Sequence, residues 1–366
     1  MGLAKFTVLV TTLIISFISF SSEAQALMER PVIGILSQPV KKQSNENTNT
    51  NDTINDQYIA ASYVKWVESG GASSIPIPYD ADETLIREIF SQINGILLPG
   101  GGVELPSSVK SIWKLALESN QNGEFFPVWG TCLGFEFLVA LNDGGDEEHT
   151  MQTGFKSQNI SFPLIFPSEE DVIDSKGVYS VQSQLYPTQE WRETLMSHNI
   201  TMNNHHKGIT PEHFLKNQAL SSFFHITSTN IDLEGKPFVS TIESSLYPIY
   251  GVQYHPEKNN FEYGLQAHNS AAFEAISHTQ EAVALSMHLA LFFVNKVRES
   301  TIGEYTLIDR HPAIYTYPVV KSVYFEQVYL IPPAEHWGSS TSTATSSSGD
   351  GLYKPSQLRK RIATSR

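Results

Sequence analysis

The sequence of 366 residues contains a single cysteine, Cys132. One cysteine cannot form a disulfide within the chain, so the fold must be stabilised by its hydrophobic core instead of by covalent cross-links. About 300 residues lie between an amino-terminal apolar run and a polar carboxyl-terminal segment, and they are enough for one large domain.

The sequence also lacks an apolar run as long as the roughly 20 residues that a membrane-spanning helix needs. The longest run, residues 6–20, follows Lys5 and precedes Ala24-Gln25-Ala26, a pattern typical of a cleaved secretory signal. We therefore expect residues 1–26 to be removed. The mature chain is then expected, with no membrane anchor, in a secretory, lysosomal or vacuolar lumen or outside the cell.

Three Asn-x-Ser/Thr sequons agree with such a route and mark expected surface positions, at Asn51, Asn159 and Asn199.

Clusters of basic residues are missing from the body of the chain, in which acidic residues predominate. The totals are 24 Lys and Arg against 38 Asp and Glu, a net charge of -14, which argues against a nucleic-acid partner. Neither an HExxH motif nor a group of cysteine ligands occurs, so the sequence predicts no metal and no cofactor.

Apolar runs and helical periodicities alternate along most of the chain, which predicts an α/β fold. We expect a mostly parallel central sheet with helices on both faces, and ligands beyond the carboxyl ends of its strands. The predicted strands are residues 31–38, 74–78, 95–98, 125–129 and 248–253. The predicted helices are residues 58–68, 82–93, 107–119, 133–141 and 281–299.

The remaining segments are harder to interpret. Residues 41–53 read as a surface loop, residues 150–229 as additional strands and loops, and residues 305–332 as terminal strands. We predict one catalytic domain over residues 27–333. A Ser- and Thr-rich disordered tail is predicted over residues 334–366, because its composition cannot bury a core.

The lone cysteine lies in the sequence Gly-Thr-Cys-Leu-Gly, between a predicted buried strand and a predicted helix. This is the form of a nucleophile elbow, in which glycines flank a nucleophile on a tight turn. The backbone N–H of Leu133 would then stabilise an oxyanion, with a second donor from the turn at residues 100–102. We expect the helix amino terminus to lower the pKa of the thiol.

A thiol nucleophile needs a base, and the sequence GVQYHPE at residues 251–257 contains one. His255 follows a predicted buried strand, and Glu257 lies two residues later, so both side chains face the same way in an extended chain. The carboxylate is thus expected to orient the imidazole and stabilise its charged form.

Three segments, LLPGGGVEL, PVWGTCLGFEFL and GVQYHPEKNNFEY, resemble the gamma-glutamyl hydrolases of peptidase family C26 in their order and spacing. The segments RPVIGILSQP and QYIAASYVKWVESGGA are similar to the opening of that family, so the resemblance covers about residues 30–299. The family is a branch of the class I glutamine amidotransferase-like, flavodoxin-like fold. The resemblance therefore implies this fold and hydrolysis of gamma-glutamyl bonds.

The resemblance also implies roles for individual residues. It makes Cys132 the nucleophile, His255 its base and Glu257 the orienting acid. It matches His206, in a His-Lys pair with Lys207, to a histidine in the central region of the family, although the neighbouring His205 is an alternative. The remaining residues are assigned to an oxyanion hole of Leu133 and Gly101 and to substrate binding by Glu136 and Gly100.

The sequence thus predicts a thiol hydrolase that cuts folylpoly-gamma-glutamates, with that substrate and water as its partners. Two alternatives stay open, namely a glutaminase of an amidotransferase and a catalytically silent binding protein of the same fold. The sequence does not decide between cutting at the end of the glutamate chain and cutting inside it. It also leaves the oligomeric state open, a homodimer included.

Overall fold

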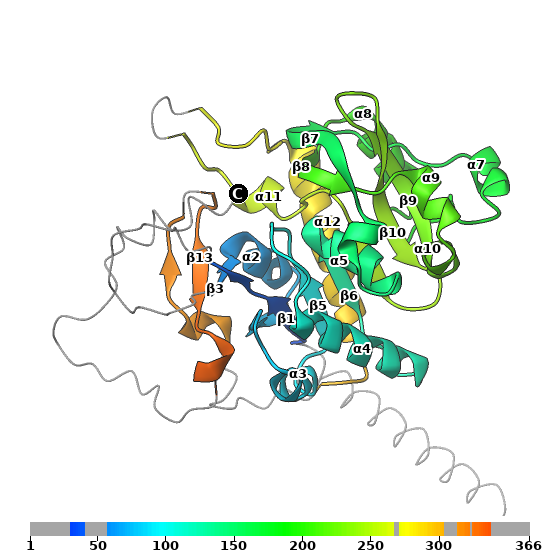
Figure 1. Cartoon of the computed structure of the whole chain (residues 1–366). Coiled ribbons are helices and arrows are strands. Elements are labelled where there is room, and N and C mark those ends of the chain that lie inside the picture. Colours follow the sequence, from blue (N-terminus) through cyan, green and yellow to red (C-terminus); the bar gives the residue numbers. More distant parts are fainter. Residues whose placement is uncertain (1–29, 41–56, 267–270, 304–312, 323, 338–366) are drawn as a thin grey trace, which may run out of the picture.

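A seven-stranded sheet forms the centre of the molecule in the computed structural model, which describes residues 30–40, 57–266, 271–303, 313–322 and 324–337 (Figure 1). The predicted signal segment, the predicted loop at 41–53 with Asn51, and the tail beyond Trp337 lie outside the described residues. Among those described, no helix combines the length and the apolar character needed to cross a bilayer.

The strand order of this sheet is β4-β1-β5-β6-β11-β10-β9. The first five strands run parallel, and the last two are antiparallel to their neighbours. The predicted α/β class with a mostly parallel sheet is therefore confirmed. In sheet order, the strands are Ser73–Ile77, Val32–Leu36, Gly95–Leu98, Val128–Thr131, Ile249–Val252, Pro237–Ser244 and Phe224–Ile231.

Helices cover both faces of the sheet, because its central strands are apolar on both sides. In β1, Val32 and Leu36 pack into one hydrophobic cluster and Ile33 and Ile35 into the other. The first cluster includes residues of α3 (Glu83–Phe90), α4 (Ser107–Gln121) and α5 (Leu133–Asn142). The second includes residues of α2 (Ala61–Ser69) and α12 (Gln280–Arg298).

The predicted helix at residues 58–68 is wrong in its first turn. Gln57–Ala60 form a strand, β3, and the helix α2 begins at Ala61. β3 pairs with β13 (Val328–Ile331) near the other end of the chain and with β2 (Gln38–Pro39), in a four-stranded sheet that β12 (Val319–Val320) completes. Helical periodicity cannot detect a strand partner that lies so far along the sequence.

The predicted strand at residues 125–129 begins later, at Val128, and continues to Thr131. Phe126 is not part of the sheet, because its N–H donates to Oδ1 of Asn120 at 3.1 Å in the loop that follows α4. This shift has a consequence for the site, since it brings Cys132 to the residue directly after the strand.

The central region that the sequence left unresolved builds an antiparallel unit on the edge of the sheet. β7 (Gln152–Phe162) pairs with β8 (Thr201–Gly208) in a two-stranded ribbon, which lies beside β9 and β10 in Figure 1. Short helices precede and connect these strands, namely α6 (Glu147–Thr150), α7 (Glu169–Asp174), α8 (Gln189–Ser197), α9 (Pro211–Lys216) and α10 (Gln218–Phe223). A further short helix, α11 (Lys258–Phe261), follows β11.

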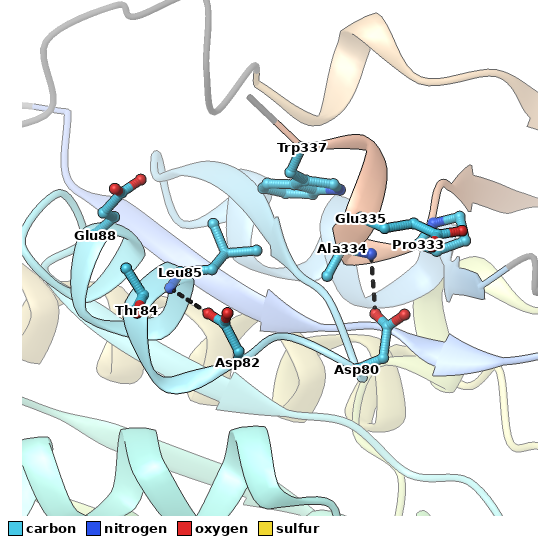
Figure 2. A pocket seen from close by; sticks show the side chains of 9 residues that line it. All are labelled: Asp80, Asp82, Thr84, Leu85, Glu88, Pro333, Ala334, Glu335 and Trp337. Carbon is cyan, nitrogen blue, oxygen red and sulfur yellow. Dashed lines mark hydrogen bonds between the residues drawn. The ribbon is translucent and has the colours of Figure 1, made fainter. Parts of the chain in front are cut away.

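The first residues of the predicted tail contact the body of the protein. The backbone N–H of Ala334 donates to Oδ1 of Asp80 at 3.1 Å, and Trp337 and Ala334 line one pocket with Asp82 and Glu88 (Figure 2). Two 3₁₀ turns belong to this end of the chain, Ile314–Thr316 and Ala334–His336.

Candidate active site

The residues predicted to form the site lie at the carboxyl ends of neighbouring strands, as expected for a parallel sheet. Cys132 directly follows β6, Gly100 follows β5, and His255 follows β11. β6 lies between β5 and β11, so these three residues start from adjacent positions along one edge.

Cys132 occupies the strained backbone conformation of a nucleophile elbow. Its φ is 51° and its ψ is -104°, and it is the residue before the first turn of α5. A positive φ is uncommon for a residue other than glycine and costs about 1–3 kcal/mol where it is enforced. The N–H of Cys132 donates to the carbonyl of Val252 at 2.8 Å, which ties the elbow to β11.

The two glycines of the motif are required by packing. A Cβ on Gly134 would lie 2.0 Å from the carbonyl oxygen of Leu98, and a Cβ on Gly130 would lie 2.5 Å from the carbonyl oxygen of Gly134. No side chain fits at either position, because real Cβ contacts are never so short. The elbow therefore packs directly against the end of β5.

The nucleophile and its base converge on Gly100. A Cβ added there would lie 2.4 Å from Cε1 of His255 and 3.2 Å from Cβ of Cys132. The same point is 2.8 Å from the phenol oxygen of Tyr63. Three functional side chains thus surround one glycine, and the structure brings Cys132 and His255 together as the sequence predicts.

His255 and Glu257 form a buried hydrogen-bonded pair. Nδ1 of His255 lies 2.8 Å from Oε1 of Glu257, and the backbone N–H of His255 donates to the carbonyl of Met202 in β8. Burial lowers the pKa of His255 below its usual value, although Glu257 opposes this effect. With Nδ1–H donated to Glu257, the imidazole is neutral and its Nε2 is free to accept a proton.

Burial raises the pKa of the Cys132 thiol, and the nearby carboxyl of Glu136 raises it further. Lys258 and the N–H of Leu133 act in the opposite direction, but their effects are smaller. The expectation of a thiol with a lowered pKa beside a charged imidazole is therefore wrong, because desolvation outweighs the helix terminus. The directions of the two pKa shifts favour a neutral thiol beside a neutral imidazole.

Two residues that the sequence did not single out hold the glycine turn. The phenol oxygen of Tyr63 accepts a hydrogen bond from the N–H of Gly100 at 2.7 Å, and Nε2 of Gln38 donates to the Gly100 carbonyl at 2.7 Å. Since the N–H of Gly100 is already occupied, Gly101 is the turn's candidate for a second oxyanion donor. Tyr63 lies on the core-facing side of the predicted helix, where an aromatic residue reads as packing.

Glu136 lies inside the protein, in the first turn of α5 and close to the thiol. It is only 4 % exposed, and Nε2 of Gln253 donates to its carboxyl at 3.2 Å. Burial raises the pKa of Glu136 to about 7, so its carboxyl is partly protonated near neutrality. Glu136 thus lies close to Cys132, and its predicted contact with substrate stays a prediction.

The structure distinguishes the two histidines of the central region. They alternate across β8, so the side chain of His205 is buried and that of His206 is exposed. Nδ1 of His205 donates to the carbonyl of Lys207 at 2.6 Å, and its ring packs between Phe155 and Phe238. Burial lowers the pKa of His205 to about 4, with a further contribution from His255. His205 thus belongs to the interior of the antiparallel unit, whereas a role for the exposed His206 in the site stays a prediction.

A buried ion pair lies next to the catalytic residues and was not predicted. Nζ of Lys258 donates to Oε1 of Glu274 at 2.7 Å, and Nδ2 of Asn204 donates to the same oxygen at 2.6 Å. A charged pair out of contact with water needs such additional hydrogen bonds. Lys258 is the residue after Glu257, so its charge is held close to the thiol and the imidazole.

Metal ligands are not grouped in the part of the chain that the structure describes: it contains no cluster of three or more His, Cys, Asp or Glu side chains able to hold an ion.

Known proteins resemble this chain over most of its length. The family model described as Peptidase C26 matches residues 31–257. Gamma-glutamyl hydrolase B of Dictyostelium discoideum is 37 % identical over 313 residues, which cover 82 % of each chain. The gamma-glutamyl hydrolase of Homo sapiens is 35 % identical, covering 82 % of this chain and 90 % of its own. Gamma-glutamyl hydrolase 1 of Arabidopsis thaliana is 38 % identical, covering 76 % and 75 %.

Proposed function

Because this chain belongs to the Peptidase C26 family, we propose that it hydrolyses the gamma-glutamyl bonds of folylpoly-gamma-glutamates through a Cys132 acyl-enzyme. The comparisons confirm the predicted resemblance and the class of enzyme, a gamma-glutamyl hydrolase. The observation that supports the mechanism best is the convergence of Cys132, His255 and Tyr63 on Gly100.

The reaction follows from the neutral resting pair. Nε2 of His255 accepts the thiol proton as Sγ of Cys132 attacks the gamma-carbonyl carbon, and the carbonyl oxygen becomes an oxyanion. The N–H groups of Leu133 and Gly101 stabilise that oxyanion. The imidazolium then gives its proton to the departing amine, so the C–N bond breaks and a thioester remains. Water, deprotonated by the same imidazole, attacks the thioester and restores the thiol.

Each catalytic group has one task in this scheme. Glu257 keeps the proton on Nδ1, which leaves Nε2 as the base and stabilises the transient imidazolium. The site needs no charged thiolate before substrate arrives, because proton transfer and attack take place together. This explains how a thiol with a raised pKa serves as a nucleophile.

The substrate assignment is tested by incubating the purified protein with a pteroylpentaglutamate and identifying the products by mass spectrometry. Release of free glutamate indicates cutting at the end of the chain, and release of oligoglutamate indicates cutting inside it. A pteroyl conjugate of the same length with alpha-linked glutamates is the matched control and should stay intact. No cleavage of either conjugate, or equal cleavage of both, would contradict the proposal.

We also propose that the chain is exported and glycosylated. Asn159 and Asn199 are both exposed, as carriers of a glycan must be, and this supports the sequons at these positions. Digestion with a peptide N-glycosidase should lower the apparent mass of protein secreted from eukaryotic cells. Homodimer formation stays a prediction, which sedimentation of the purified chain would test.

A further inference from the structure

We propose that Tyr63 is a positioning residue for acyl transfer, which fixes the oxyanion-binding turn at Gly100 and Gly101 and links it to the catalytic pair of His255 and Glu257. The proposal rests on the proposed acyl-enzyme mechanism. It concerns a side chain that no sequence motif marks as functional.

The phenol of Tyr63 lies at the junction of the turn and the catalytic pair. It comes from α2, on the face of the sheet opposite α5, and it is 2 % exposed. Its oxygen accepts from the N–H of Gly100 at 2.7 Å and lies 3.3 Å from Nδ1 of His255. One oxygen atom therefore contacts both the backbone of the turn and the imidazole.

The directions of the hydrogen bonds follow from the groups present. The Gly100 N–H can only donate, so the phenol oxygen accepts there. Nδ1–H of His255 is donated to the nearer acceptor, Glu257 at 2.8 Å, so the phenol of Tyr63 lies beside the imidazole without taking that proton. Glu257 thus holds the imidazole in the form whose Nε2 is available to the thiol, and the hydrogen bond of Tyr63 acts on the turn.

The other side of the turn is held by Gln38. Its Nε2 donates to the carbonyl of Gly100, which belongs to the same peptide unit as the N–H of Gly101. A trans peptide is planar, so that N–H points away from the carbonyl and hence away from Gln38. Tyr63 fixes the preceding N–H and Gln38 fixes this carbonyl, so the two bonds together set the direction of the Gly101 N–H.

Rigid placement of such a donor matters because oxyanion stabilisation depends on groups that do not reorganise during the reaction. Burial keeps the pKa of Tyr63 well above its usual value, so the phenol stays protonated across the working pH range. Tyr63 therefore acts through the groups it holds and not by proton transfer to substrate.

The test compares Tyr63→Phe with Tyr250→Phe, a control that also removes a buried phenol hydroxyl, one that donates to Gln184. Tyr63→Phe should lower kcat by about ten- to a hundredfold, less than the loss of a whole oxyanion donor, with KM changed by less than about twofold. Alkylation of Cys132 by iodoacetamide forms no oxyanion, so its rate should change by less than about twofold. Tyr250→Phe should leave both rates unchanged.

A second readout does not depend on folate as the substrate. A gamma-glutamyl aldehyde forms a tetrahedral adduct with the thiol, and its affinity should fall in Tyr63→Phe by the same factor as kcat. Gln38→Met should likewise lower kcat and leave the alkylation rate unchanged. This variant supplies the test if Tyr63→Phe does not fold. An inactive wild type that still binds the aldehyde would overturn the substrate assignment and not this inference.

Two results would overturn the role of Tyr63. One is an unchanged kcat and aldehyde affinity in both variants. The other is an alkylation rate that falls as much as kcat, since this would mean that Tyr63 supports the thiol or the fold in general.

Discussion

The parallel strands of the central sheet, β4, β1, β5, β6 and β11 (the parallel half), and the antiparallel strands β7 to β10 (the antiparallel half) contribute to the site in different ways. The parallel half provides the reacting groups, Cys132 and His255, at strand ends that the backbone fixes. The antiparallel half provides support, through His205, Asn204 and the Met202 carbonyl. The comparison suggests that changes in the parallel half abolish the chemistry, whereas changes in the antiparallel half tune it.

The largest effect is expected from Cys132→Ala, at the centre of the parallel half. Acyl transfer has no alternative nucleophile, so kcat should fall by about a thousandfold or more. The fold should persist, and the removal of backbone strain is not expected because alanine must adopt the same positive φ. Product formation and circular dichroism check both statements. A tenth of the wild-type rate in the variant would refute the assignment.

Gly100→Ala tests the geometry of the parallel half, because it displaces catalytic groups without removing any of them. The added methyl would lie 2.4 Å from Cε1 of His255, so the imidazole must move. We expect kcat to fall by about a hundredfold, in line with the cost of misplacing catalytic groups by an ångström. Gly102→Ala, where nothing lies within 4 Å, is the control. Equal turnover in the two variants would show that His255 lies farther from the turn than described.

In the antiparallel half, His205→Asn should cost about tenfold in kcat/KM, since it removes a buried ring that packs on Phe155 and Phe238. His206→Asn, on the exposed side of the same strand, should change kcat/KM by less than about twofold. Steady-state kinetics on both variants decide the matter. A larger loss of kcat/KM in His206→Asn than in His205→Asn would support the predicted role of His206 in the site.

The pH profile should be bell-shaped, with its maximum on the acidic side of neutrality. As pH falls through the lowered pKa of His255, the base is protonated and activity is lost. As pH rises above about 7, Glu136 ionises and its charge raises the pKa of the neighbouring thiol, so attack slows. Glu136→Gln should therefore retain about fivefold more of its maximal activity than wild type at pH 8. A wild-type rate that climbs steadily to pH 8 would contradict this account.

The smallest effect is expected from shortening the carboxyl terminus. Ending the chain after Trp337 should change neither turnover nor Tm, since the removed Ser- and Thr-rich segment has little to bury. Ending it after Pro333 also removes the bond from Ala334 to Asp80 and the packing of Trp337, so Tm should fall by a few degrees. Thermal unfolding of the two truncated proteins measures the difference. A large loss of stability in the longer one would show that the distal segment docks on the body.

The sequence predicts the parallel half well, because its strands are buried and three of them, β5, β6 and β11, lead into Gly100, Cys132 and His255. Cys132, Leu133, Gly100 and His255 belong to such junctions, and local pattern is sufficient to find them. The strand at Gln57–Ala60 could not be predicted in this way, since its partner Val328–Ile331 comes from the far end of the chain.

Tyr63, Gln38 and Glu274 escaped prediction for a related reason. Each acts through hydrogen bonds to residues distant in sequence, and nothing in its own neighbourhood marks those bonds. The predicted direction of the thiol pKa shift was wrong for another reason. A helix terminus is visible in the sequence, but the extent of burial around Cys132 is not. His205 and His206 could be distinguished only when the register of β8 was known.

The solitary buried thiol also makes this protein its own reporter. Every covalent adduct formed with a cysteine reagent lies at residue 132, so the mass of the intact chain counts occupied sites directly. Cys132 is only 3 % exposed. The rates of reaction with reagents of increasing size would thus show how large a molecule can reach the thiol. The intact mass after reaction with one reagent gives the fraction of molecules with an accessible thiol, and a series of reagents gives the size that the site admits.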